Sequence, residues 1–413
     1  MITKDEFRAD AAAFLEANAE RRVEVTQVWG RGSDEVSIFP ERTPEEDGAM
    51  LSAAKEWRAK VFDAGFGWIS GPEAYGGRGL TREYERVWLS LENDYDVPSI
   101  GPFGIGLGMV APTILAHAVE GVKQRYLTSM YRGDTVACQL FSEPVAGSDL
   151  AGIQTKAIRD GEEWILNGQK VWTSGAQYSD IGEIITRTSS YPDSRHRGLT
   201  MFLVDMKAPG VEVRPLRQLN GHSEFGEVFF TDVVVPDGDR LGPEGLGWSV
   251  AISTLMQERS GLSGRPGVGP GQADALAVRA RRTGAWDDPV LRDRIMQAFI
   301  TERVLQMATV RAFASLGRSE PGAEGSIRKL THAQLEVTLG LLATEAEPGD
   351  AIAWDAPDQD AAAAVDAFLS GKILSIAGGT SEIQRNIIGE RVLGLPRDRD
   401  PYADTPFEER PNG

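Results

Sequence analysis

Apolar residues recur at intervals of three and four along the first third of the chain, which is the period of an amphipathic helix. Two such series contain Phe7, Ala11, Phe14 and Leu15, and then Leu51, Ala54, Trp57, Val61 and Phe62. Loops rich in glycine and proline interrupt the pattern at 71–77 and 98–102. The pattern predicts an N-terminal helical domain over residues 1–133.

Between residues 134 and 240 the period changes to two, in short runs rich in β-branched and aromatic residues. These runs are 164–166, 170–173, 183–186, 201–204, 211–213 and 228–235. Strands at such close spacing predict a central β-barrel or sandwich over residues 134–240. Asn167-Gly168 lies between two of the runs and predicts a tight hairpin turn.

After Trp248 the helical period returns, and it continues to about residue 394. This predicts a C-terminal helical bundle over residues 241–396. The Gly/Pro-dense stretch 261–271 would interrupt a helix, because proline lacks a backbone donor and clashes with the preceding turn. We expect the acidic segment 345–360 to be an exposed loop and the tail 397–413 to be loosely ordered.

The composition is that of a folded enzyme: 413 residues, 41% hydrophobic and 25% charged. A formal net charge of −18 offers no basic face to a nucleic acid or an anionic membrane, so neither is expected as a partner. The length and the composition therefore predict a folded chain with two or three compact units.

Metal and disulfide chemistry have little support in the sequence. Cys138 is the only cysteine, and the four histidines are dispersed without a zinc-binding spacing. We therefore expect no metal site. The polar, acidic start of the chain differs from a signal peptide, and no apolar run reaches the ~18 residues of a membrane span. These features predict a cytoplasmic location.

The segment 141–149 is the first candidate for chemistry and reads Phe-Ser-Glu-Pro-Val-Ala-Gly-Ser-Asp after a predicted strand at 135–141. Its hydroxyl groups and glycine let side-chain and backbone donors converge on an anionic or carbonyl-rich ligand. A capped turn without a ligand explains the same composition.

Two further segments have the composition of ligand sites. Trp172-Thr173-Ser174 presents an aromatic face beside hydroxyl groups, as a planar redox ring requires, although a core tryptophan would explain the aromatic. At 377–385, Ser381 and Gln384 have capping-box spacing and predict a helix start, and the glycines 378 and 379 allow close approach of a ligand. Helix capping alone explains the serine and the glutamine.

Together these segments, with the loop 71–77, resemble the acyl-CoA dehydrogenase family over nearly the whole chain. The segments 141–149 and 378–396 are similar to its two signatures, and 167–174 is similar to its flavin-facing strand. The resemblance implies an α+β multidomain fold with an N-terminal helical domain, a central β-barrel or sandwich domain and a C-terminal four-helix bundle. It also implies FAD as cofactor and a dimer or tetramer, since family sites are completed across a subunit interface.

The resemblance implies roles for individual positions. Around the flavin pyrimidine it implies Ser142 as a ring contact and Ser148 near the diphosphate or the CoA. Trp172 would cover the isoalloxazine ring, and Ser174 would bond near N5. The implied cofactor contacts are Gln139, Phe141, Ser142, Gly147, Ser148, Trp172, Thr173 and Ser174, then Arg281 and Thr283 toward a neighbouring subunit's FAD diphosphate, and Thr380 and Glu382 near the adenosine.

The implied reaction is α,β-dehydrogenation of an acyl-CoA, in which a carboxylate removes the α-proton and electrons pass on to an electron-transfer flavoprotein. Most members carry that base directly before a Gly-Thr pair, where this chain has Gly378. A minority branch carries it before an arginine on another helix, which Glu258 and Arg259 resemble. Glu258 is therefore the candidate base and Arg259 a substrate contact, with a solvated helix carboxylate as the alternative.

Two more departures shape the expected function. The prolines and glycines of 261–271 follow Glu258 along the implied acyl pocket and suggest a bulky or branched acyl group. The family's Gly-Gly-x-Gly-Phe loop, which contacts the FAD diphosphate, is replaced at 348–355. The resemblance extends to bacterial relatives that act on steroid side-chain CoA esters as α2β2 heteromers, in which one subunit type lacks a base or part of the FAD site. The alternatives are a non-catalytic partner subunit of such a heteromer, or a flavin desulfinase or monooxygenase on the same fold.

Overall fold

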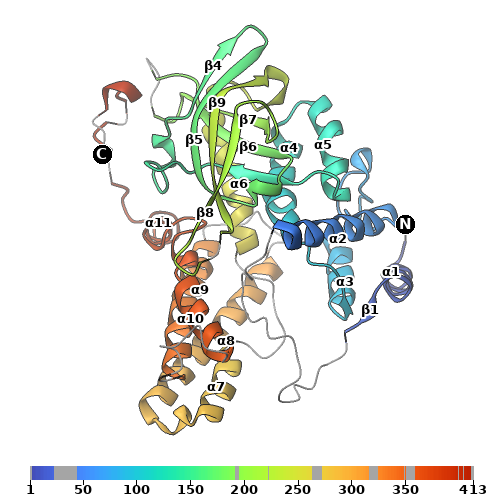
Figure 1. The fold of residues 1–413 in the computed structure, drawn as a ribbon, viewed down its shortest axis with the longest axis vertical. Coiled ribbons are helices and arrows are strands. Elements are labelled where there is room, and N and C mark those ends of the chain that lie inside the picture. Colours follow the sequence, from blue (N-terminus) through green and yellow to red (C-terminus); the bar gives the residue numbers. More distant parts are fainter. Residues whose placement is uncertain are drawn as a thin grey trace.

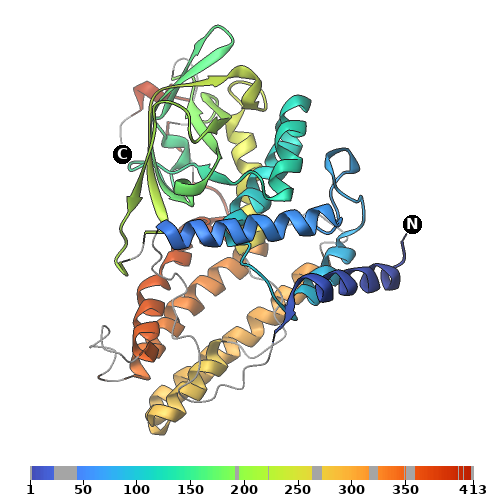
Figure 2. The ribbon, with the colours of Figure 1, turned by 45° about the vertical axis from the view of Figure 1, so that its right-hand side comes forward.

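The computed structural model describes residues 2–22, 44–190, 195–221, 223–262, 272–315, 324–347, 349, 359–398, 400–402 and 404–410. In Figure 1 a β-sheet forms one end of the molecule and a bundle of long helices forms the other. The N-terminal helices lie beside the sheet, and Figure 2 shows α2 running between the sheet and the bundle. The order helix, sheet, helix is the one that the sequence pattern predicts.

The N-terminal helices begin where the sequence offers a cap. Thr3 caps the first helix, and a capping box forms because the Thr3 side chain accepts from the backbone of Glu6 while the Glu6 carboxylate accepts from that of Thr3. Phe7, Ala11 and Leu15 then bury one face of that helix. The helices are α1 (Lys4–Asn18), α2 (Pro44–Asp63), α3 (Arg82–Glu92), α4 (Ala111–His117) and α5 (Glu120–Arg132), with the short strands β1 (Glu20–Arg21) and β2 (Tyr95–Asp96).

The central sheet contains all the period-two runs, but 164–166 and 170–173 belong to one strand and not two. Its order is β10-β7-β6-β4-β5-β9-β8, and β3 pairs in parallel with β6. The strands are β3 (Ala137–Leu140), β4 (Lys156–Asp160), β5 (Glu163–Ser174), β6 (Ile181–Arg187), β7 (Leu199–Asp205), β8 (Val211–Leu216), β9 (Phe225–Pro236) and β10 (Arg240–Leu241). β5 and β9 are the long strands of the sheet and pair along most of their length.

The hairpin turn predicted at Asn167-Gly168 is wrong, because β5 runs through both residues. The pairing between β5 and β9 shifts register there, so that the pair forms a bulge instead of a turn. Asn167 Nδ2 donates to Asp232 Oδ1 at 2.9 Å, and Asp232 N donates to Asn167 Oδ1 at 3.0 Å. The turn that joins β4 to β5 lies instead at Gly161, whose φ is +62°.

The two faces of the sheet are buried against different partners. Cys138, Leu140, Ile184 and Phe202 pack into one apolar cluster within the β-domain. The alternate residues, including Ala137, Ile181 and Ile185, pack instead against Val110 and Ile114 of the N-terminal helices and Val250 of α6 (Gly247–Leu262). All seven residues of β6 are consequently buried, and this second face is the one against which helices from both other domains are packed.

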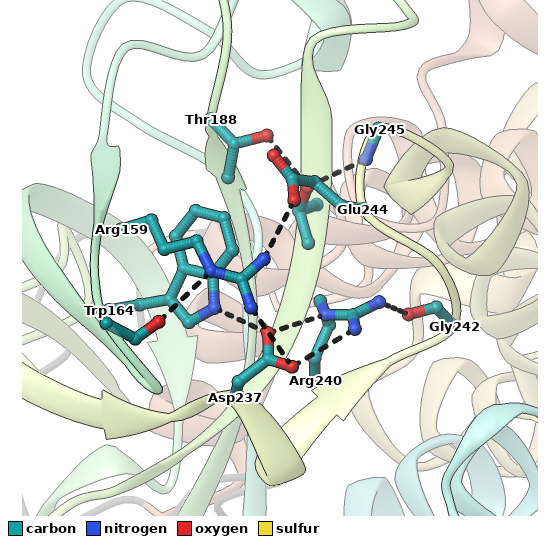
Figure 3. Close-up of polar contacts among 10 residues, drawn as sticks. Arg159, Trp164, Thr188, Asp237, Arg240, Gly242, Glu244 and Gly245 are labelled. Atoms are coloured by element: carbon teal, nitrogen blue, oxygen red, sulfur yellow. Dashed lines mark hydrogen bonds and ion pairs between the residues drawn. The ribbon is translucent and has the colours of Figure 1, made fainter.

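A polar network holds the chain where it leaves the sheet for α6 (Figure 3). Asp237 accepts from Arg240 Nε at 3.0 Å and from Trp164 Nε1 at 2.8 Å. These hydrogen bonds, Arg240's first, lower the pKa of Asp237 to about 2. Arg159 reaches Glu244 at 3.3 Å, so the hairpin of β4 and β5 is tied to the segment that starts α6. The network thereby ties the segment before α6 to the sheet.

The C-terminal helices form the bundle that the sequence predicts. They are α6 (Gly247–Leu262), α7 (Gln272–Thr283), α8 (Pro289–Ser315), α9 (Glu324–Glu345), α10 (Gln359–Ser370) and α11 (Ser381–Ile387). Residues 263–271, within the predicted helix interruption at 261–271, lie outside the described residues. The predicted exposed loop 345–360 is wrong at its start, because Glu347 is buried and its carboxylate pairs with Arg279 Nε at 2.8 Å.

The described part of the tail makes a contact with the central sheet. Figure 1 shows the last described residues of the tail beside that sheet. The guanidinium of Arg187 on β6 lies over the ring of Phe407 at 3.7 Å, and Arg410 pairs with Asp400 at 3.1 Å within the tail. A contact between residues far apart in the sequence therefore connects the tail to β6.

Candidate active site

The loop after β3 is clamped to β5 by a buried ion pair. Lys170 Nζ lies 2.9 Å from Glu143 Oε1 and also donates to the carbonyl oxygen of Phe141 at 3.0 Å. The two charged side chains are 0% and 4% exposed. Val171 N donates to Ser142 O at 2.9 Å, so the loop and the strand run side by side here. Two candidate segments far apart in the sequence, 141–149 and 172–174, are thereby brought together.

The Glu143 carboxylate organises the rest of the loop. It accepts from the backbone N–H groups of Gln154 at 2.7 Å and Thr155 at 3.0 Å. Burial would raise the pKa of Glu143, but Lys170 and these donors outweigh burial and lower it. Burial lowers the pKa of Lys170 to about 8, against the attraction of Glu143. An ion pair that is buried this completely is stable only because each charge has its partner.

Holding Glu143 inward leaves the far side of the loop exposed. Ser142 is half-buried, whereas Gly147 and Ser148 are exposed. A Cβ at Gly147 would meet nothing within 4 Å, so the backbone there stands open on that side. The Asp149 carboxylate pairs with Arg195, which holds the end of the loop. The predicted contacts Ser142, Gly147 and Ser148 therefore lie on one accessible loop edge.

Trp172 is presented to solvent by a distortion of β5. The register between β5 and β9 shifts between Lys170 and Thr173, and Trp172 has a φ of +61°. Such a conformation is costly for a residue with a bulky side chain and persists where surrounding structure enforces it. The indole is 57% exposed and meets the ring of Phe225 edge-on at 5.8 Å. The core explanation of this tryptophan is therefore wrong.

Among the described residues, two buried polar atoms of predicted site residues have no hydrogen-bond partner. They are Thr173 Oγ1 and Gln139 Nε2, and the Thr173 side chain is fully buried. Buried polar groups are almost always satisfied in folded proteins, so an ordered water or a bound group has to supply the partner. A flavin fits this set of residues, because its ring offers a face for Trp172 and carbonyl and nitrogen acceptors along its edge. Ser174, half-buried beside Thr173, is a further hydroxyl donor in reach of the same surface.

The predicted capping box at Ser381 and Gln384 is wrong by one residue. Thr380 is the N-cap of α11, and its hydroxyl accepts from Ile383 N at 3.3 Å. The Gln384 side chain turns back and donates to the carbonyl oxygens of Gly378 at 3.0 Å and Gly379 at 3.2 Å. Both glycines have positive φ, which explains the pair. Glu382 is exposed and pairs with Arg385 at 3.1 Å.

The predicted diphosphate contacts lie far from Trp172 in this chain. Arg281 and Thr283 end α7, at the opposite end of the molecule from the sheet in Figures 1 and 2. The Arg281 guanidinium stacks at 4.0 Å over the ring of Trp286, and Thr283 Oγ1 donates to Ala346 O at 2.8 Å. Within one chain, Arg281 and Thr283 therefore do not reach the surface around Trp172.

The candidate base lies on α6, but its side chain and that of Arg259 are outside the described residues. The helix itself places residue 258 one turn after Thr254. The replaced loop 348–355 also lies outside the described residues, except for Gly349. Among the described residues no cluster of His, Cys, Asp and Glu could hold a metal ion, and none of the helices found there is long and apolar enough to cross a membrane.

A group of buried polar residues where β6 meets α4 and α6 was not predicted from the sequence. Glu183 on β6 is fully buried and accepts from Thr254 Oγ1 at 2.6 Å. Thr254 Oγ1 in turn lies 2.9 Å from Thr113 Oγ1 on α4. The signal was present, since a glutamate interrupts the apolar run 181–185, but its meaning depends on the helices that cover the strand.

Comparison with solved structures first defines the class of fold. A steroid acyl-CoA dehydrogenase structure, Tcur3481-Tcur3483, has a TM-score of 0.74 at 22% identity and covers 96% of this chain and 98% of that one. The ChsE4-ChsE5 complex from Mycobacterium tuberculosis has a TM-score of 0.68 at 25% identity over 96% and 99%. The class is therefore the helix–sheet–helix fold of acyl-CoA oxidoreductases.

Sequence relatives then give the family. The acyl-CoA dehydrogenase IpdE1 of Mycobacterium tuberculosis is 35% identical over 95% of this chain and 98% of its own length, and IpdE1 of Mycolicibacterium smegmatis is 34% identical over 96% and 99%. Profiles for the acyl-CoA dehydrogenase N-terminal, middle and C-terminal domains match residues 33–134, 138–233 and 245–393. The chain belongs to the acyl-CoA dehydrogenase family, which is a family of flavoprotein oxidoreductases.

Proposed function

We propose that this enzyme dehydrogenates a bulky or branched acyl-CoA thioester between its α and β carbons, with FAD as cofactor and an electron-transfer flavoprotein as acceptor. The observation that carries the proposal is that the Glu143–Lys170 pair holds the 141–149 loop against β5, two residues before the outward-facing indole of Trp172. Relatives described as steroid acyl-CoA dehydrogenases favour a bulky acyl group.

Each residue then has a defined task. FAD would supply the acceptor for the β-hydrogen and its electron pair. Trp172 covers one face of the ring, while Ser142 and Ser174 orient its edge. Glu258 removes the α-proton of the thioester. Most members use for this a carboxylate at the position where this chain has Gly378. Arg259 contacts the substrate. Ser148 lies on the exposed loop edge, where a CoA or a diphosphate can reach it.

An exposed apolar stripe on α8 supports an oligomer. The residues that form it recur every three or four positions and are 39–63% exposed: Met296, Ile300, Val304, Met307 and Val310. A continuous apolar helix face of this kind is typical of a helix that packs against a further subunit. Arg281 and Thr283, at the far end of the same bundle, would then contact the FAD of a neighbouring subunit. The assembly is either a homo-oligomer or an α2β2 heteromer with a related subunit, as in the ChsE4-ChsE5 complex.

The test begins with the purified chain and its visible spectrum, in which oxidised flavin absorbs near roughly 370 and 450 nm. Anaerobic mixing with branched and alicyclic acyl-CoA esters should bleach the longer-wavelength band. Glu258→Gln should keep the flavin and slow that bleaching by about 10²–10⁴-fold, because general-base catalysis is worth that much. The matched control is Glu162→Gln, at an exposed glutamate of the β4–β5 turn.

Other outcomes separate the alternatives. Unchanged bleaching by Glu258→Gln would contradict the assignment of the base. A colourless chain that gains flavin only when a related subunit is co-expressed would place it in a heteromer, and activity that then survives Glu258→Gln would make it the non-catalytic subunit. Sulfite release would indicate a desulfinase, and rapid oxygen consumption by NADH-reduced flavin would indicate a monooxygenase.

A further inference from the structure

One buried guanidinium holds the chain where it leaves the 141–149 loop. Arg187 on β6 is 3% exposed. Its Nη2 donates to Ala151 O at 2.8 Å and to Arg195 O at 3.1 Å, and its Nε donates to Ile153 O at 3.3 Å. A planar guanidinium can meet several carbonyl oxygens at once, because its N–H groups form a rigid fork. Arg187 therefore joins the end of the loop to the segment that contains Arg195.

The segment around Arg195 is joined to the loop a second time. The Arg195 guanidinium pairs with the carboxylate of Asp149, the last residue of the loop. Gly152 is packed against this pair, since a Cβ there would lie 2.9 Å from Asp149 Oδ2 and 3.1 Å from Arg195 Nη2. The loop is thus anchored at its start by the buried ion pair with β5, and at its end by Arg187 and Arg195.

A residue of the tail covers one face of Arg187. The ring centroid of Phe407 lies 3.7 Å from Arg187 Cζ, and Figure 1 shows this part of the tail beside the sheet. The face of a guanidinium is weakly hydrated and stacks on aromatic rings, whereas its edge makes the hydrogen bonds. Burial lowers the pKa of Arg187 to about 10, against the attraction of Glu143. The ring therefore keeps water from the N–H groups that hold the loop.

The tail is folded around Arg410 next to this ring. The Arg410 side chain is 11% exposed, and it pairs with Asp400 at 3.1 Å and donates from Nε to Thr405 O at 3.4 Å. Phe407 lies in the segment that these contacts close. Burial and then the charge of Arg410 lower the pKa of Arg195, and Asp400 opposes them. The tail therefore lies beside both of the cations that anchor the end of the loop.

We propose that Arg187 and Phe407 are positioning residues that hold the 141–149 loop in the conformation that binds the flavin. The part of this inference that concerns the flavin rests on the proposed function. Gly147 and Ser148 are exposed, so the position of this loop edge depends on the anchors at its two ends. The second anchor is covered by a ring from the last part of the chain. A change in the tail should therefore loosen the loop and weaken flavin binding, although the tail residue itself acts only through Arg187.

Hydrogen exchange of the full chain, followed by mass spectrometry, tests the anchor without substrate or activity. The reporter amides are those of Gly152 and Gln154, whose hydrogen bonds go back to the loop. Phe407→Ala should speed their exchange about 3–30-fold and leave the amides of α9 unchanged, because the loss of a desolvated cation–π contact permits a local opening. Phe407→Tyr keeps the ring and should restore slow exchange. The matched control is Tyr402→Ala, at an exposed ring of the same tail, which should change nothing.

Flavin binding is the second measurement. The Kd for FAD, from titration followed by tryptophan fluorescence, should rise about 3–30-fold in Phe407→Ala and stay constant in Tyr402→Ala. Arg187→Lys keeps the charge but lacks the fork, so it should loosen the same amides. Adding Phe407→Ala to it should have little further effect, because the ring then covers no group that holds the loop. Melting curves report whether each variant is folded.

Each outcome decides one part of the inference. Unchanged exchange at Gly152 and Gln154 in Phe407→Ala, or an equal increase in α9, would overturn it. Faster exchange with an unchanged Kd would contradict the role of the anchor in flavin binding. If the unsubstituted chain binds no FAD, the proposed function fails, whereas the exchange rates still decide whether Arg187 and Phe407 hold the loop.

Discussion

Replacing Glu183 by glutamine should make the protein more stable, and by an amount that grows with pH. Burial raises the pKa of this carboxyl group from its ordinary value of 4.5 to about 8. Between these two values the folded protein holds a proton that the unfolded chain has released. The stability contributed by the neutral acid is therefore fully present below pH ~4.5 and is lost as the pH rises through about 8.

The size of the effect follows from the same shift. One pKa unit corresponds to ~1.4 kcal/mol, so the rise from 4.5 to about 8 corresponds to at most ~4–5 kcal/mol of unfolding free energy above pH 8. Glutamine has nearly the same shape, is neutral at every pH and avoids this loss. In a chain of 413 residues 1 kcal/mol shifts the melting temperature by about 1 °C, so the variant should melt ~3–5 °C higher at pH 8.5 and nearly equally at pH 5.

Thermal unfolding followed by tryptophan fluorescence at several pH values measures this difference. Glu162→Gln, at an exposed position, controls for the loss of one negative charge and should show no such pH trend. A melting-temperature difference that stays constant from pH 5 to 8.5 would refute the reasoning. It would mean that burial does not keep the Glu183 carboxyl group neutral. The protonation state assigned to Glu183 in its contact with Thr254 would then be wrong.

Two further predictions concern the ring site. Trp172→Ala should leave the melting temperature of the flavin-free protein nearly unchanged, because the indole is 57% exposed, but it should weaken FAD binding by ~1–2 kcal/mol; equal affinity in a flavin titration would remove Trp172 from the site. Lys170→Met should cost about 3–5 kcal/mol of unfolding free energy in urea, because it leaves Glu143 buried without its cation. Adding Glu143→Gln should recover most of that loss, and simple additivity of the two changes would contradict the pairing.

Periodicity predicted the main strands and helices of this protein, although it did not predict β4 and it divided β5 in two. The runs 183–186 and 201–204 became β6 and β7, and the helical repeat after Trp248 became α6 to α10. Each of these elements buries an apolar face, so its pattern is written into its own residues. The segments 141–149 and 172–174 could be recognised for a similar reason, since their hydroxyls, glycine and aromatic stand next to one another in the chain.

Predictions failed where a distant residue decided the local structure. Asn167-Gly168 has the sequence of a hairpin turn, but Asn167 pairs with Asp232, which is 65 residues away, and the strand continues. The contact between Phe407 of the tail and Arg187 of β6 was likewise not predicted. In both cases the two residues in contact are far apart in the sequence, so a pattern read over a short stretch contains only one of them.

The sequence alone determined the order of the helical, sheet and helical parts and the resemblance to the family, because these depend on local pattern and on motifs read along the chain. Only the tertiary structure decided that the 141–149 loop lies against β5, that Trp172 faces outward, and that Glu183 ends a buried polar chain. These features arise from contacts between residues 27 to 141 positions apart. The burial of a charge or a hydroxyl is a property of what packs around it, and packing exists only in the folded chain.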